Sequence, residues 1–101
     1  MANEIEIAEL PIKLIRGNVQ IYKLDHVVSQ QIDASATQDD SAAFNDDVVM
    51  IRVENTGATA TRIAVWDTAG TVDATNSVLL SAGQIMDIQV QPGQILSSKV
   101  V

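Results

Sequence analysis

The 101-residue chain has no cysteine, and this absence removes several structures and reactions at once. It can form no disulfide, no thiolate zinc site and no cysteine nucleophile. Aromatic residues are also scarce, with one Phe, one Trp and one Tyr. Such a chain has few of the stacking surfaces on which sugars and single-stranded nucleic acids are bound. We therefore expect no cysteine chemistry and no carbohydrate-binding platform.

Basic residues are few, since 6 lysines and arginines stand against 13 aspartates and glutamates and give a net charge of -7. Counterion release then favours binding to nucleic acid very little, so nucleic acid is not an expected partner. No run approaches the roughly 20 apolar residues that cross a bilayer, and the first seven residues carry acids where a signal peptide carries bases. We expect no membrane partner and synthesis in the cytoplasm without a signal peptide.

What the sequence does have is apolar residues at every second position. Hydrophobic residues make up 47% of the chain, which is enough for the core of one domain. No window shows helical spacing, whereas residues 48–54, 62–67 and 84–91 alternate as half-buried strands do. The alternation predicts that the following residues face inward: Val49, Ile51, Val53, Ile63, Val65, Met86, Ile88 and Val90.

Turn signals separate these strands. Gln91-Pro92-Gly93-Gln94 has the Pro and Gly of a type II turn, and Ser81-Ala82-Gly83-Gln84 is a similar tetrapeptide. Gly17-Asn18 predicts a hairpin that pairs Leu14 with Ile21. The spacing predicts an all-β protein, namely a single small antiparallel β-sandwich or jelly roll with about seven to nine short strands.

Residues 33–47 lack alternation and predict a long loop, with one helical turn after Asp40 as an option. Asp39, Asp40, Asp46 and Asp47 crowd four carboxylates into it, but their spacing matches no dedicated calcium loop. His26, with Asp25 and Ser29, forms a poor catalytic relay because neighbours on a strand point in different directions. We therefore expect no enzyme, no metal site and no cofactor.

Charge and proline placement point to the first 24 residues as a contact region. Residues 10–24 hold three bases and no acid, a local +3 against -10 for the rest, which together give -7. This basic stretch could dock onto an acidic protein surface or pair with the chain's own acids. Pro11 has no main-chain N–H group to donate to a neighbouring strand, so we expect a boundary there. Residues 1–10 would form an N-terminal arm or edge strand, and residues 11–101 the sandwich.

Ile5 and Ile7 alternate with glutamates in this segment, and the pattern suits a strand added to another subunit's sheet. Trp66, on an alternating strand, is more typical of a core or interface anchor than of a ligand platform. The candidate partner-binding residues are Ile5, Ile7, Lys13, Arg16, Lys23 and Trp66.

The second half of the chain carries a resemblance. It reads Val49-x-Ile51-x-Val53-x-Asn55-Thr56-Gly57, then Arg62-Ile63-x-Val65-x-Asp67, and later Leu79-Leu80-Ser81-Ala82-Gly83-Gln84 and Val90-Gln91-Pro92-Gly93-Gln94. These strands and turns resemble the small cysteine-free β-sandwiches that decorate, or cement, the capsids of tailed bacteriophages. The resemblance implies a virion location on the capsid surface, a major capsid protein or other virion protein as partner, and no catalytic residues.

We therefore expect a non-enzymatic capsid decoration protein that acts as a homo-oligomer, with a trimer as the expected state. The same patterns occur in immunoglobulin-like modules of bacterial surface proteins. The alternative hypothesis is thus a β-sandwich binding or adhesion module, including a form that depends on a cation in the acidic loop.

Overall fold

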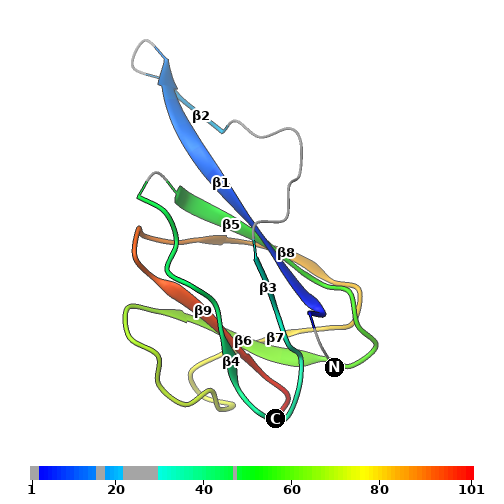
Figure 1. Ribbon diagram of the computed structural model, residues 1–101. Helices are drawn as coiled ribbons and strands as arrows, with labels where there is room; N and C mark the ends of the chain where they lie inside the picture. Colours follow the sequence, from blue (N-terminus) through cyan, green and yellow to red (C-terminus); the bar gives the residue numbers. More distant parts are fainter. Residues whose placement is uncertain (1–2, 16–17, 22–29, 47) are drawn as a thin grey trace.

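The computed structural model describes residues 3–15, 18–21, 30–46 and 48–101, and it gives the main chain alone for residues 11–15 and 18–21. In this part of the chain nine strands form two antiparallel sheets that pack face to face (Figure 1). The predicted all-β sandwich is confirmed.

Each sheet takes strands from both halves of the chain. The first sheet has the order β2 (Asn18–Ile21), β1 (Ile5–Ile15), β5 (Val48–Asn55) and β8 (Ile85–Gln89), and β3 (Gln30–Ile32) also pairs with β1. The second sheet has the order β4 (Asp39–Asp40), β9 (Ile95–Lys99), β6 (Thr61–Trp66) and β7 (Val78–Leu80).

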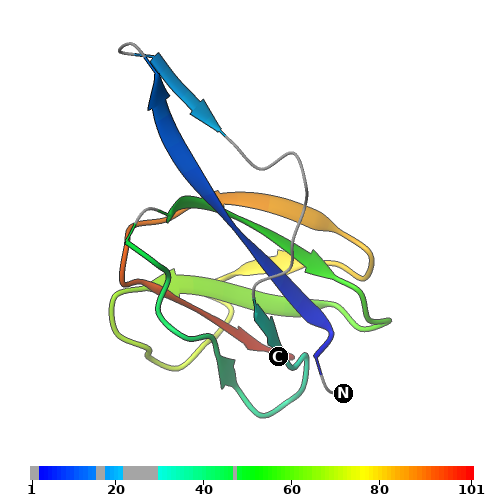
Figure 2. The same ribbon diagram turned by 45° about the horizontal axis from the view of Figure 1, so that its top comes forward.

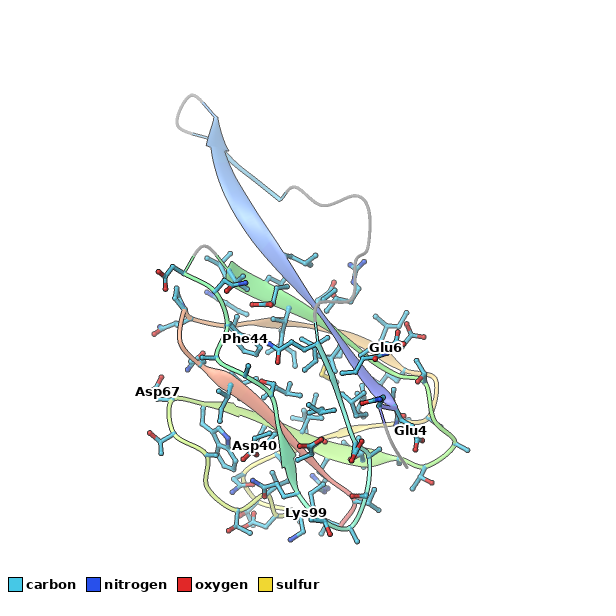
Figure 3. All side chains as sticks on the ribbon, in the orientation of Figure 1. Glu4, Glu6, Asp40, Phe44, Asp67 and Lys99 are labelled. Atoms are coloured by element: carbon cyan, nitrogen blue, oxygen red, sulfur yellow. The ribbon has the colours of Figure 1, made fainter. Side chains whose placement is uncertain are left out.

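The core lies between the two sheets, as the alternation predicts. In β5, Ile51 and Val53 are fully buried, and in β6 Ile63 is buried while Val65 packs at the edge of the core. Phe44, from the segment before β5, completes the core (Figure 3). The predicted inward positions Ile51, Val53, Ile63 and Val65 are thus confirmed, and Met86 and Ile88 of β8 also face the core but are only partly covered. The prediction for Val49 is wrong: Val49 is partly exposed and Val48 is the core residue, at the point where the pairing with β1 shifts its register.

The two similar tetrapeptides form similar turns. The Gln94 amide donates to the Gln91 carbonyl at 3.1 Å, and the Gln84 amide donates to that of Ser81 at 3.0 Å. Gly93 and Gly83 have φ of 85° and 77°, a left-handed conformation that costs glycine little. Each turn also has its last glutamine side chain accept from the first residue's amide. The prediction of turns at these positions is confirmed.

The expected N-terminal arm is wrong. Residues 5–10 are the first part of β1, where β5 pairs with one side of the strand and β3 pairs with Ile5–Ile7 on the other. Ile5 and Ile7 have no exposed surface and belong to the core. Alternation alone fits a core strand as well as a docking strand, because it gives the buried face of a strand and not the chain that buries it.

What leaves the sandwich is the chain after Pro11. The pairing of β1 with β5 ends at Pro11 and Val48, with a register shift between Leu10 and Pro11. Beyond this point β1 pairs with β2, and the two form a ribbon that projects from the sandwich in both views (Figures 1 and 2). We call this ribbon, residues 12–15 and 18–21, the projecting hairpin.

The hairpin register differs from the predicted one by two residues. Ile12 pairs with Ile21, and Leu14 pairs with Val19, so Ile15 and Asn18 are the last partners before the turn. Asn18 is thus a strand residue paired with Ile15, and not part of the two-residue turn that was predicted. A shift of two keeps the same residues on the same face of a strand, so the predicted grouping of Ile12, Leu14, Val19 and Ile21 is unaffected.

The segment 33–46 is more ordered than a simple loop. It contains β4, in which Asp39 pairs with Ser98 and Asp40 with Ser97, and no helical turn follows Asp40 in the residues described. After β4 the chain runs beside β9, since the Ser41 amide donates to Leu96 and the Phe44 amide donates to Gln94. Main-chain pairing with a distant strand leaves no alternation in the sequence, which is why this strand was not predicted.

Candidate docking site at the open edge of the sandwich

A groove lies where the two sheets end. β8 is the last strand of the first sheet and β7 is the last strand of the second, within the described part of the chain. Between them the groove has a volume of about 650 Å³, and residues of β6, β7, β8 and the segment 75–77 line it. Its size is in the range of concave binding sites in proteins.

The groove is apolar because residues on the inner faces of the sheets are left uncovered there. Met86 and Ile88 pair with the buried residues Val53 and Ile51 of β5, which places them on the inner face, yet both are only partly buried. Val78 pairs with buried Ile63 but is 50% exposed. These side chains would be core residues if a further strand covered the edge.

The neighbouring loop holds one rim of the groove in place. Asp73 accepts hydrogen bonds from the Thr75 amide and hydroxyl at 2.8 and 2.6 Å, and from the Asn76 amide at 3.1 Å. These bonds, with those to Thr75 contributing most, hold the pKa of Asp73 below its ordinary value. Arg62 donates to the Ser77 carbonyl at 3.2 Å, so the loop is also fixed from β6.

The outer face of β8 is charged and paired. Arg52 and Asp87 are register partners on β5 and β8, and their side chains form two hydrogen bonds of 2.7 and 2.9 Å. The bonds to Asp87 raise the pKa of Arg52, so the guanidinium stays charged. Because both side chains are substantially exposed, this pair adds little to stability.

Trp66 lies on the opposite side of the second sheet and anchors a loop. Its indole Nε1 donates to the Ser97 hydroxyl at 3.0 Å, and that hydroxyl donates to the Asp40 carboxylate (labelled in Figure 3). Gly70 lies against the indole ring, where an added Cβ would come within 3.4 Å of it. Gln38 completes the contact by donating to the Gly70 carbonyl at 2.8 Å. Trp66 therefore acts as a packing anchor in this chain.

The predicted partner-binding residues do not form one surface. Ile5 and Ile7 are in the core, and Trp66 packs on the outer face of the second sheet. Lys13 occupies a register position opposite Gln20 in the projecting hairpin. Arg16 and Lys23 lie outside the described residues.

The acidic segment is occupied by its own hydrogen bonds where the structure describes it. Asp39 accepts from the Asp33 amide at 2.8 Å, and Asp40 accepts from Ser97 and from Gln38. In the described residues no three His, Asp or Glu side chains are grouped as metal ligands are. Asp47, and the trio Asp25, His26 and Ser29, lie outside the described residues.

Sequence reasoning missed the groove itself. Met86 and Ile88 were correctly placed on an inner face, but alternation does not say whether a strand ends its sheet or lies inside it. The available signal was Val78, an apolar residue in a short segment beside a turn, which the structure leaves exposed in the groove lining.

These observations define a small antiparallel β-sandwich with an open apolar edge and a projecting hairpin. In the part of the chain that the structure describes, no helix is long and apolar enough to cross a membrane. No family model matches the sequence, and neither a curated protein nor a solved structure shows a significant match to the chain. The geometry of the chain itself is therefore what bears on its function.

Proposed function

We propose that the chain is a non-enzymatic structural protein of a virion, a capsid decoration protein that binds the assembled shell as a homo-oligomer. One observation supports this proposal. The small sandwich has both an apolar groove at its open edge and a hairpin that projects from it. Both features lie at the surface and are of the kind that proteins use to bind other chains. A cement protein requires such contact surfaces and no reacting groups.

The mechanism is linkage by mass action. A protein that binds the assembled shell and not its separated subunits shifts the assembly equilibrium toward the shell. At a free concentration of about 100 times Kd, each occupied site contributes about 2.7 kcal/mol. An oligomer that touches several capsid subunits at once binds more tightly than one copy. After the first contact has formed, the others form within one complex and lose little further translational and rotational entropy.

The acidic segment favours the virion proposal over a cation-dependent adhesion module. Asp39 and Asp40 already accept hydrogen bonds from Asp33, Ser97 and Gln38. Binding an ion there would require these bonds to break, and Asp40 shares Ser97 with the Trp66 anchor. The Asp40 carboxylate thus stabilises the pairing of β4 with β9.

Particles of the virus whose genome encodes the chain provide the test. We expect an antibody against the chain to label the heads of purified particles in many copies. Particles from which the gene has been deleted should release their nucleic acid at a lower temperature, and added purified protein should restore the wild-type temperature. Particles without the gene serve as the control for labelling.

Two outcomes would contradict the proposal. Purified particles that carry no label would show that the chain is not a virion component. Labelling confined to the envelope of the host cell would support the adhesion module instead.

A further inference from the structure

The groove offers main-chain as well as apolar contacts to an incoming strand. β7 and β8 each have one neighbour in their sheet, within the described residues, so both present an edge. An extended segment placed between them can form ladder hydrogen bonds and cover the inner-face residues Val78, Met86 and Ile88. This combination of two strand edges and an apolar floor suits a strand better than a compact small molecule.

The projecting hairpin has the complementary composition. Its register pairs Ile12 with Ile21 and Leu14 with Val19, so apolar residues occupy paired positions along the ribbon. Its strands pair with each other beyond the end of β5. A two-stranded ribbon by itself is marginal in water, so this hairpin gains stability from any surface that covers it.

The distribution of charge favours a second copy of the chain as the partner of the hairpin. Residues 10–24 carry +3 with no acid, whereas the rest of the chain carries -10. Near the groove the charges balance, since Asp87 is bonded to Arg52 on the outer face and the rim holds Arg62 as well as Asp73, so the attraction comes from the net charge of the sandwich as a whole. Within one copy β5 separates β1 from β8 in the sheet, and the described residues that line the groove belong to β6, β7, β8 and the segment 75–77. An acidic sandwich of a second copy is therefore a matching partner.

We infer that the groove between β7 and β8 binds the projecting hairpin of a second copy of this chain. This inference rests on the proposed function for the role of the oligomer. It adds the two surfaces through which the copies of the oligomer contact each other. Because the hairpin and the groove are different surfaces, the contact is head to tail. Such contacts close into a ring when the rotation between copies permits, and a trimer is one such ring.

Two variants separate the halves of the contact. In the first, Asn-Gly replaces residues 13–20, which joins the register partners Ile12 and Ile21 by a two-residue hairpin turn. In the second, Val78→Arg places a bulky charge in the groove. Leu79→Arg is the matched control, since Leu79 is 49% exposed against 50% for Val78 and faces the outer side of the same strand.

Sedimentation of the purified proteins measures the result. We expect the wild-type chain and Leu79→Arg to be oligomers at micromolar concentration, and the two other variants to be monomers. When the shortened-hairpin variant and Val78→Arg are mixed, one intact groove meets one intact hairpin. The mixture should therefore form a 1:1 heterodimer and nothing larger.

Several results would overturn the inference. A monomeric wild-type chain at high micromolar concentration would do so, as would an oligomer that survives Val78→Arg. A mixture that stays monomeric would show that the hairpins contact each other or another surface. Circular dichroism spectra that match the wild type are required of each variant, and an unfolded Val78→Arg is replaced by Val78→Lys, which keeps the positive charge on a more flexible side chain.

This experiment is independent of the virion test. An oligomer of the expected kind with no label on virus particles would keep the inference and reject the decoration role. Labelled particles with a monomeric chain in solution would keep the role and reject the hairpin contact.

Discussion

Asn55 is the residue on which several turns of the sandwich depend. It is fully buried, its side-chain amide donates to the Thr59 carbonyl at 2.8 Å and the Leu80 carbonyl at 3.2 Å, and its side-chain oxygen accepts from the Gly57 amide at 3.0 Å. The side chain thus bonds three main-chain groups that belong to the turn after β5 and to β7. Buried main-chain groups that lose their partners are costly.

We predict that Asn55→Ala lowers the free energy of unfolding by about 2–4 kcal/mol, because it leaves two carbonyls and one amide without this partner. Urea unfolding followed by circular dichroism measures the change. Asn45→Ala is the control, since Asn45 is exposed and, among the described residues, bonds to Glu9 and Val48 through its main chain. Its effect should stay within about 0.5 kcal/mol. Equal effects of the two substitutions would contradict the role given to Asn55.

Nothing in the sequence around Asn55 shows that this residue is buried. Asn followed by Thr and Gly is a local turn signal, and such signals predict well because a few neighbouring residues decide the conformation. The bond to Leu80 joins residues 25 apart in the chain. Nothing in the local pattern records such a contact.

At the level of the elements, β1 is the strand that ties the first sheet together. Its first half lies between β3 and β5 and its second half forms the hairpin with β2. Ile7, in the first half, has no exposed surface. The sandwich therefore needs this segment for its own core.

We predict that Ile7→Ala lowers the free energy of unfolding by about 3 kcal/mol, as removal of a buried aliphatic side chain leaves a cavity. Urea unfolding is again the measurement. Ile85→Ala, at a residue that is 53% exposed on the outer face of β8, should change stability by less than about 1 kcal/mol. A stable Ile7→Ala protein would restore the idea of a detachable N-terminal arm.

The elements show how far sequence reasoning carries. The strands β5, β6 and β8 and the turns at Gly83 and Gly93 follow from alternation and turn chemistry. The two-residue strand β4, the hairpin register and the central position of β1 do not, because each depends on which distant strands pair. Pro11 did mark the exit from the sandwich, but the chain that leaves is the part after it.

At the scale of the whole molecule, the separation of charge makes association depend on salt. In the contact that we infer between copies, the basic stretch of one copy would attract the acidic remainder of the next, and salt would screen this attraction. The candidate site could not be predicted from the sequence, because an open edge is a property of the assembled sheets and not of any single segment.

We predict that the dissociation constant of the oligomer rises about tenfold between about 0.05 M and about 0.5 M sodium chloride. Lys13→Glu should weaken the oligomer at low salt and flatten this dependence. Lys99→Glu makes the same change of charge on β9 in the sandwich, and should leave the salt dependence as in the wild type. Sedimentation at each salt concentration gives the constants, and identical behaviour of the two variants would argue against a contact through the hairpin.

The continuity of β1 has a mechanical consequence. The hairpin and the centre of the first sheet share this one strand, so a force that pulls on the hairpin along its axis passes directly into the ladders with β3 and β5. Ladder hydrogen bonds lie across the strands, and a load along β1 therefore strains many of them together in shear instead of opening them one by one. A copy held by its hairpin would resist tension through a strand that is paired on both sides, which is a property that the proposed role on a capsid would use.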